Sequence, residues 1–179
     1  MKFREAEYND YAEIAKLHAK SWQRHYRGIV TDAYLDQYAE DDRLVIWQTR
    51  LTNPAFNQHI LVAEDDDKIC GFICIYGNHN YELGTIIDNL HVDSAYQGHG
   101  LGTRLMLEAA MWTAKFFPDN GLYLEVLEQN QAAKQFYQVL GGKDIEIRDW
   151  QSPCGSLVKE SVIRWDNPET LLEKTRTFV

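Results

Sequence analysis

The sequence predicts an α/β (α+β) fold, in which helices flank a mixed β-sheet. Its 179 residues suit one domain over residues 1–179 with its own hydrophobic core. Apolar residues make up 45% of the chain and charged residues 25%, close to the globular average. The hydrophobic period is helical in the first third of the chain, and strand and helix patterns then alternate. Together these observations indicate helices packed on a mixed sheet.

A strand and three helical segments are expected in the N-terminal third. Residues 1–7 begin like a strand, and Asn9 and Asp10 are residue types that cap helices. Gly28 ends the first helix, and Asn53-Pro54 ends the third. The positions that recur at helical spacing in the first helix are Ile14, Leu17, His18, Ser21 and Trp22. The two further helical segments cover 31–37 and 41–51.

The pattern changes to strands from residue 59. The segments 59–64 and 68–76 read as a hairpin across three consecutive aspartates. Because a run of charge is usually a solvated surface, we interpret Glu64 to Asp67 as an exposed turn rather than a metal site. Further strands are expected over 81–92, 122–127, 144–150 and 157–165, and helices over 101–117 and 131–140, while the tail from Asp166 shows no clear pattern.

The charge balance limits the classes of partner. The chain has 18 basic and 27 acidic side chains, a net charge of −9. Nonspecific nucleic-acid binding depends on Lys and Arg neutralising phosphates, so this composition disfavours it. The acidity suits a cationic small molecule somewhat better, although a solvated acidic surface is the more common explanation of such a charge.

The cysteines and the apolar runs indicate a cytoplasmic protein. Cys70, Cys74 and Cys154 are few and odd in number and lack the paired spacing of a zinc site, so we expect no bound metal. They read as apolar residues in a reducing compartment. No apolar run reaches 18 residues, and the N-terminus is too polar for a signal peptide, so no contact with a membrane is expected.

The most informative segment is a turn with three glycines at alternate positions, Gly98, Gly100 and Gly102, between an expected strand and an expected helix. Helix N-termini carry unpaired N–H groups and the positive end of the helix dipole. Glycines let a phosphate approach that backbone without meeting a Cβ. The turn is therefore a candidate anion site.

The spacing of the glycines selects among phosphate-binding motifs. The dinucleotide fingerprint places its third glycine five residues after the first, whereas Gly102 follows Gly98 by four. A Walker loop requires Gly-Lys-Ser/Thr, and no lysine follows here. The segment 97–102, Gln-Gly-His-Gly-Leu-Gly, instead resembles the pyrophosphate loop of the GCN5-related N-acetyltransferases (GNAT), which bind acetyl-coenzyme A.

Residues on both sides of this loop extend the resemblance. The family precedes the loop with a strand of the form Leu-x-Val, and follows it with a strand, an Asn, and a helix bearing Ala and Phe-Tyr before two glycines. The order and spacing match over about 61–142 and more loosely before it. The matching residues are Leu90, His91, Val92, the segment 122–126, Asn130, Ala133, Phe136, Tyr137, Gly141 and Gly142.

The resemblance implies a splayed mixed sheet with the cofactor, acetyl-CoA, between strands 86–92 and 122–127. Residues of about 58–142 would form the cofactor-binding core, and the helices within 9–51 the acceptor side. Backbone groups of the first strand would pair with the pantetheine arm like an added strand, and the loop would hold the pyrophosphate. The residues implied in cofactor binding are Leu90, His91, Val92, Gln97, Gly98, His99, Gly100, Leu101, Gly102, Thr103, Asn130 and Phe136.

The resemblance also implies that Tyr137 is the general acid. Attack of an amine on a thioester expels a thiolate, and a phenol has a pKa close enough to that of a thiol to donate a proton. The alternative is that Tyr137 belongs to a core-facing stripe with Ala133, Phe136 and Leu140. Asn130 has a similar double interpretation, because it also suits a plain helix cap.

The general base is left open. Asp88 alternates in phase with Ile86, Leu90 and Val92, and a carboxylate on an apolar face can accept a proton directly or through water. Glu125 on the neighbouring strand and a water chain are the alternatives, and Asp88 also suits a structural hydrogen-bond acceptor beside a bulge. Neither His91 nor His99 is expected to be catalytic.

Trp22, Tyr26 and Glu125 are the candidates for acceptor binding. Aromatic walls attract amine cations, although Trp22 and Tyr26 equally suit a hydrophobic core. His18 and His25 lie seven residues apart without a third ligand, so we interpret them as packing or surface residues.

These residues lead to three functional hypotheses. The first is an acetyl-CoA-dependent N-acetyltransferase that acts on a small-molecule or peptide amine by direct attack in a ternary complex. The second is a noncatalytic acyl-CoA sensor, because a fold does not determine a function. The third is a general nucleotide-phosphate binder. The last strands are also candidates for pairing in a homodimer.

Overall fold

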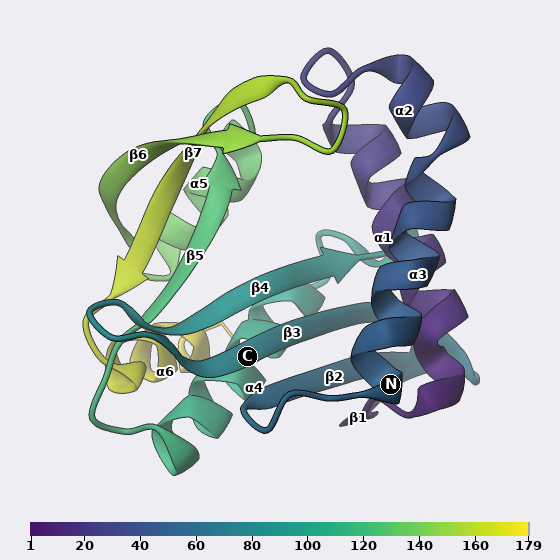
Figure 1. Ribbon diagram of the computed structural model, residues 1–179. Helices are drawn as coiled ribbons and strands as arrows, with labels where there is room; N and C mark the ends of the chain where they lie inside the picture. The colour runs from purple at the N-terminus through teal and green to yellow at the C-terminus, as the bar shows by residue number, and fades with distance from the viewer. Residues whose placement is uncertain (179) are drawn as a thin grey trace.

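The computed structural model describes residues 1–178, so Val179 of the predicted domain lies outside the described residues. The strands are β1 (Lys2–Glu5), β2 (Gln58–Asp65), β3 (Lys68–Asn80), β4 (Gly84–Val92), β5 (Leu122–Leu127), β6 (Lys143–Gln151) and β7 (Leu157–Trp165). The helices are α1 (Tyr11–His25), α2 (Asp32–Gln37), α3 (Ala39–Thr52), α4 (Leu101–Phe116), α5 (Gln131–Val139) and α6 (Pro168–Arg176). The strands form one mixed sheet in the order β1-β2-β3-β4-β5-β7-β6, which confirms the expected fold class (Figure 1).

Helices cover both faces of the sheet. On one face α1 and α3 pack on β2 and β3 through a core that includes Ile14, Trp47, Val62 and Phe72. On the other face α4, α5 and α6 enclose the larger core, which includes Ile73, Ile75, Leu105, Met106, Trp165 and Leu171. In α4, Leu101, Leu105 and Ala109 recur every four residues and are all buried, which explains why this segment is an amphipathic helix. Cys70 and Cys74 are buried and unpaired, as expected.

The sheet opens between β4 and β5, its parallel neighbours. The two strands pair only at Thr85 with Leu122 and at Ile86 with Tyr123. Beyond these pairs they diverge, so that the β1–β4 part and the β5-β7-β6 part of the sheet form a wedge (Figure 1). The backbone groups of β4 from Ile87 to Val92 therefore have no strand partner on the β5 side.

A β-bulge interrupts β4 inside this wedge. On β3, Cys74 pairs with Asn89 and Ile75 pairs with Ile87, so Asp88 is the extra residue. The bulge shifts the alternation of side chains by one residue. Asp88 contacts Arg50 of α3, whereas Leu90 and Val92 pack on the opposite core. The prediction that Asp88 alternates in phase with Leu90 and Val92 is therefore wrong.

The C-terminal helix α6 is absent from the sequence-based prediction, which leaves the tail unassigned. Asn167 caps the helix by accepting a hydrogen bond from the Thr170 N–H, and Pro168 occupies its first turn. Leu171 and Thr175 are fully buried. Asn-Pro is a helix-start signal, but Pro168, Leu171 and Thr175 are the buried positions of this helix and only one of them is a large apolar residue, so the periodicity is weak. The predicted strands 122–127 and 157–165 coincide with β5 and β7, whereas β4 begins at Gly84 rather than at residue 81.

Two features bear on the expected partners. β6 is an edge strand of the sheet, and its Ile145 and Ile147 are exposed. Pairing of the last strands in a homodimer stays a prediction. None of the helices in residues 1–178 combines the length and the apolar character needed to cross a lipid bilayer.

Gly84 holds the point from which β4 and β5 diverge. Its φ is +95°, and an added Cβ would lie 2.1 Å from the carbonyl oxygen of Gly121. We expect Gly84→Ala to lower the free energy of unfolding by about 3 kcal/mol, because it adds a backbone clash to the strain of a positive φ. Urea denaturation measures this loss.

Gly155→Ala is the matched control. Its φ is +87°, but an added Cβ would meet nothing within 4 Å. It should cost about 1 kcal/mol from backbone strain alone. Equal losses in the two variants would contradict the role given to the contact between Gly84 and Gly121.

Candidate active site

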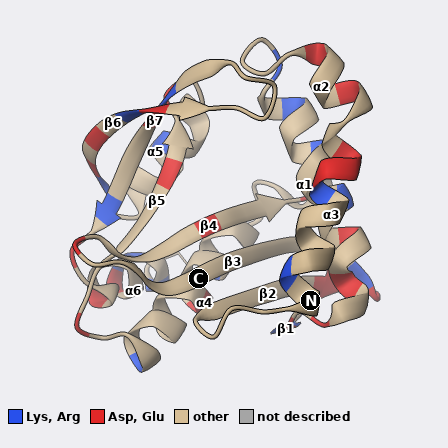
Figure 2. Ribbon diagram, viewed as in Figure 1, with Lys and Arg blue, Asp and Glu red and all other residues tan. Residues whose placement is uncertain are grey.

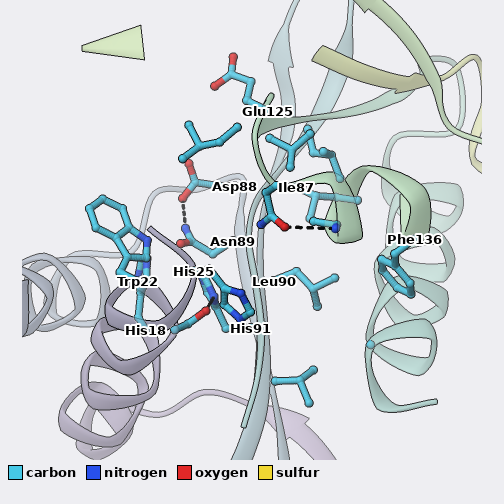
Figure 3. A pocket seen from close by; sticks show the side chains of 18 of the residues that line it. His18, Trp22, His25, Ile87, Asp88, Asn89, Leu90, His91, Glu125 and Phe136 are labelled. Carbon is cyan, nitrogen blue, oxygen red and sulfur yellow. Dashed lines mark hydrogen bonds between the residues drawn. The ribbon is translucent and has the colours of Figure 1, made fainter. Parts of the chain in front are cut away.

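The wedge between β4 and β5 holds a cavity of about 810 Å³. This volume lies within the range of small-molecule and cofactor pockets. Its walls come from α1, α3, β4, the start of α4, β5, α5, and the loop between β6 and β7. Figure 3 shows Trp22, His18, His25 and His91 together on the α1 side of the cavity and Phe136 on the opposite side.

One end of the cavity is the glycine turn. Gly98 and Gly100 both have φ of +79°, and an added Cβ at either would meet nothing within 4 Å. The first backbone hydrogen bond of α4 runs from Arg104 N to Gly100 O at 2.9 Å. The N–H groups of residues 101–103 therefore have no acceptor within the helix. Residues 100–103 all line the cavity, so the turn presents the predicted anion site to it.

The side chains at the turn differ in how they meet the cavity. Thr103 lines it, as does Gln97, whose side-chain amide donates a hydrogen bond to the Val92 carbonyl at 3.0 Å. His99 is exposed and is not among the cavity-lining residues, although its neighbours Gly98 and Gly100 are. A role for the His99 side chain in binding therefore has no support from its position.

The helix α5 supplies the next wall. Its cap residue Asn130 accepts a hydrogen bond from the Ala133 N–H at 3.3 Å, so the capping interpretation is confirmed, and Asn130 also lines the cavity. Phe136 and Tyr137 line it as well, with their rings 5.2 Å apart. The Tyr137 ring also meets Trp165 edge-on at 6.4 Å. Tyr137 therefore packs against the core and also lines the cavity. A place in the core-facing stripe is compatible with a role as general acid.

Burial keeps two phenols of the cavity protonated. It raises the pKa of Tyr137, and the nearby Tyr26 raises it further. Burial raises the pKa of Tyr26 to about 12, with Arg43 opposing the shift and Glu160 adding to it. Tyr26 therefore lies close enough to Tyr137, Arg43 and Glu160 to interact electrostatically with each of them.

Asp88 is held by a cation. Its carboxylate forms an ion pair with Arg50 of α3 at 2.7 Å and accepts a hydrogen bond from the Asn89 side chain. The Arg50 guanidinium lies 5.0 Å from the centre of the Trp47 ring. Burial opposes the charge on Arg50, but Asp88, Cys74 and Tyr76 together outweigh it and raise the pKa of the guanidinium. The bulged carboxylate therefore lies in the cavity wall with a fixed partner.

A pair of glutamates faces the cavity from the other part of the sheet. Glu125 of β5 pairs with Arg148 of β6 at 3.1 Å. Burial, assisted by the charge of Glu125, raises the pKa of Glu160 of β7 to about 7, although Arg148 opposes the shift. Acidic positions on β4 and β5 border the same opening in Figure 2. Glu160 is the carboxyl group of the cavity that can exchange a proton near neutral pH.

Sequence reasoning missed Glu160, although a signal was present. Glu160 alternates in phase with Val158 and Val162, which are both buried. An acid at an inward position of a strand is a candidate for a raised pKa. What the sequence lacks is the pairing of β7 with β5, which places Glu160 opposite Leu127 at the cavity wall.

The histidines of the α1 side are structural. Trp47 donates a hydrogen bond from Nε1 to Nδ1 of the buried His18 at 3.0 Å. The His18 ring lies 4.4 Å from His91, whose Nδ1 is 2.8 Å from the Ser21 hydroxyl. Burial, His25 and Arg43 lower the pKa of His91 to about 3. Both rings are therefore neutral, and their contacts tie α1 to α3 and β4.

The expected acceptor wall contains one further residue that sequence reasoning missed. Trp22 is buried and Tyr26 half-buried, and both line the cavity with their rings 4.9 Å apart. The Arg43 guanidinium lies 4.2 Å from the centre of the Trp22 ring and also lines the cavity. In residues 1–178 no group of three or more His, Cys, Asp or Glu side chains is placed to hold a metal ion.

Comparisons with known proteins agree with this geometry. The model of the acetyltransferase (GNAT) family matches residues 12–141. No match was found among curated proteins. Similar solved structures include the PaiA N-acetyltransferase of Thermoplasma acidophilum in complex with coenzyme A, at 19% identity and a TM-score of 0.68 over 92% of this chain and 98% of that one. YncA of Salmonella typhimurium, solved with acetyl-CoA, is 18% identical with a TM-score of 0.65 over 93% of each chain. A GNAT acetyltransferase of Streptococcus pneumoniae is 24% identical with a TM-score of 0.66 over 93% of this chain and 98% of that one.

The raised pKa of Glu160 makes stability depend on pH. The carboxyl has a pKa of about 7 in the folded chain against an ordinary value of 4.5. Between these values the folded state binds more protons than the unfolded state, so this group's contribution to stability falls as pH rises to about 7. We therefore expect Glu160→Gln to gain stability relative to the unmodified protein between pH 5 and pH 8, as measured by urea midpoints.

Glu173→Gln, on the exposed side of α6, is the control for loss of one negative charge. It should follow the unmodified protein at each pH. The assignment of a raised pKa to Glu160 fails if Glu160→Gln and the unmodified protein show the same pH dependence.

Proposed function

Because the chain belongs to the GNAT family of acetyltransferases, we propose that it transfers the acetyl group of acetyl-CoA to a primary amine by direct attack in a ternary complex. The observation that carries this proposal is the composition of one cavity of about 810 Å³. A helix start with unpaired N–H groups, a half-buried phenol and a carboxyl group whose pKa is raised to about 7 all line it. The free cysteines fit a reducing compartment, and we propose the cytoplasm as the location.

The residues present fit acetyl-CoA, which supplies the activated acetyl group as a thioester. The unpaired N–H groups at the start of α4 suit a diphosphate, and open space lies where Gly98 and Gly100 lack a Cβ. The unpaired edge of β4 from Ile87 to Val92 offers backbone groups to the pantetheine amides, as an added strand does. N–H groups beside the bulge, near Leu90, would polarise the thioester carbonyl.

Tyr137 is the proposed general acid. Attack of the amine nitrogen on the acetyl carbon forms the N–C bond and breaks the C–S bond. The sulfur leaves as a thiolate, to which the Tyr137 hydroxyl donates its proton. The raised pKa of Tyr137 keeps that proton in place at neutral pH. Holding both reactants in one cavity removes much of the entropic cost of their encounter.

Glu160 is the proposed general base. An ammonium group cannot attack, so the acceptor must lose a proton, and a group with a pKa near the working pH is best suited to take it. Glu160 has this pKa and lies close to Tyr26. The carboxylates of Asp88 and Glu125 are each held in an ion pair. Asp88 remains the alternative base, because its bulge places it in the same cavity.

Replacement of Tyr137 by phenylalanine tests the proposed chemistry. Acceptor screening should first find amines that release thiol from acetyl-CoA. We then expect Tyr137→Phe to lower kcat by about 10²- to 10⁴-fold, because a phenyl ring cannot protonate the leaving thiolate. The affinity for coenzyme A, measured by calorimetry, should stay within about twofold, because the change removes one hydroxyl and preserves the ring contacts. Coenzyme A binding without turnover of any amine would favour a sensor instead.

Paired substitutions identify the base. In the unmodified protein kcat/KM should rise as pH increases through about 7, because Glu160 must lose its proton before it can accept one. Glu160→Gln should lower kcat/KM by about 10²-fold at pH 8 and abolish that limb of the profile. Asp88→Asn, which leaves Glu160 in place, should keep the limb. A limb lost in Asp88→Asn and kept in Glu160→Gln would assign the base to Asp88.

A further inference from the structure

Arg43 is a buried charge without a counterion. Its exposure is 8%, and no hydrogen-bond acceptor lies at its Nε. Among residues 1–178 no aspartate or glutamate lies within the 4.0 Å of an ion pair with it, whereas Arg50, two turns later on α3, pairs with Asp88 at 2.7 Å. The carboxylate next to it in sequence, Asp42, instead accepts a hydrogen bond from the Tyr34 hydroxyl at 2.6 Å. A buried charge is costly unless it is paired. The buried guanidinium of Arg43 would therefore be stabilised by an anionic partner.

The position of Arg43 is determined by an aromatic ring. The guanidinium lies 4.2 Å from the centre of the Trp22 ring, and Trp22 is itself buried. Contact with a ring face satisfies none of the N–H groups, which lie in the guanidinium plane and suit a planar carboxylate. The Tyr34 hydroxyl, which donates to Asp42, also lies close to the guanidinium, but it is a neutral group and leaves the charge of Arg43 unbalanced. Because Arg43 lines the cavity, its guanidinium borders the space that a ligand would occupy.

No group around Arg43 neutralises it. The rings of His18 and His91 are neutral, because burial lowers the pKa of each. The phenol of Tyr26 is protonated, because burial raises its pKa. The negative groups of the cavity belong to its other walls, where Arg50 and Arg148 already pair with two of them. The α3 side of the acceptor region is therefore locally positive, although the whole chain has a net charge of −9.

We propose that Arg43 binds a carboxylate of the acceptor, so that the substrate is an aminocarboxylic acid such as a free amino acid. This inference rests on the proposed N-acetyltransferase function and names its substrate class. One unpaired guanidinium balances one negative charge, and the acidic residues of the facing walls disfavour a dianion such as a phosphate monoester. The carboxylate at Arg43 would orient the amine toward Glu160, since Arg43, Tyr26 and Glu160 all line the same cavity. The net charge of the chain favours a cationic acceptor, but the unpaired charge of Arg43 favours an acceptor that also has a carboxylate.

The test compares acceptors that differ only in the carboxylate. Free amino acids, the same amino acids as primary amides, the corresponding decarboxylated amines, and aminoalkyl phosphates are supplied with acetyl-CoA, and thiol release is measured. The unmodified protein should prefer the carboxylates by about tenfold or more in kcat/KM, since hydrogen bonds to charged groups are among the strongest in proteins. Arg43→Gln should lose about 10- to 100-fold on the carboxylates and less than about threefold on the amides. Arg43→Lys, which keeps the charge without the planar fork, should fall between them.

Arg164→Gln is the matched control. Its Nε is also buried without a partner, but Arg164 does not line the cavity. It should keep the preference for carboxylates, and coenzyme A affinity should stay within about twofold in all variants that fold, because none of the substitutions touches the glycine turn. Circular dichroism identifies any variant that does not fold, and the preference of the unmodified protein tests the proposal without a variant.

The outcomes separate this inference from the function on which it rests. Equal or better turnover of amides, amines or phosphates by the unmodified protein overturns the carboxylate site and leaves the acetyltransferase standing. Equal losses by Arg43→Gln on carboxylates and amides also overturn it. If no amine is acetylated, the proposed function fails. Calorimetry then decides the site: amino-acid binding that Arg43→Gln abolishes supports it, and absence of binding overturns it.

Discussion

The divergence of β4 from β5 is the constraint on which the rest of the molecule depends. Two parallel strands that pair at only two positions leave unsatisfied backbone on both sides of a wedge. Such groups are tolerated only where water or a ligand meets them. The close contact of Gly84 with Gly121 holds the narrow end, and α1, α3 and α5 form the walls that turn the wedge into a cavity. The glycine turn, the phenols and the carboxylates line one cavity because the strands separate there.

Opposite charges are distributed over different walls of that cavity. Arg43 and Arg50 lie on α3, and Glu125 and Glu160 lie on β5 and β7. Asp88 and Glu125 are each paired with an arginine within the wall. Among residues 1–178, Arg43 and Glu160 form no such ion pair, and they have opposite charges when ionised. An acceptor with one group of each sign would complete both sides at once. In the proposed acceptor site, local charge rather than the net charge of the chain would therefore determine which acceptor is selected.

The sequence was sufficient for features that depend on local pattern. The helix after Gly100, the strand 122–127 and the cap at Asn130 follow from hydrophobic period and capping preference, and the structure has each of them. The spacing of the three glycines also indicated the anion site at the start of α4.

Features that depend on pairing between strands far apart in the sequence could not be predicted from it. The bulge at Asp88 arises from register with β3, so alternation counted along β4 alone gave the wrong face. Glu160 reaches the cavity only because β7 inserts between β5 and β6. Arg43 is one of nine arginines and belongs to no motif or cluster in the sequence. Its position against Trp22 arises only when α3 packs beside α1.

The bare edge of β4 has a thermodynamic consequence for the protein as a whole. From Ile87 to Val92, the backbone of β4 pairs with no residue of β5, so a ligand can take the place of a strand there. A molecule that fills this place binds the native chain and not the unfolded one, so mass action raises resistance to unfolding with each increase in its concentration. The open edge of β4 therefore couples the free energy of unfolding to the concentration of any ligand that occupies it.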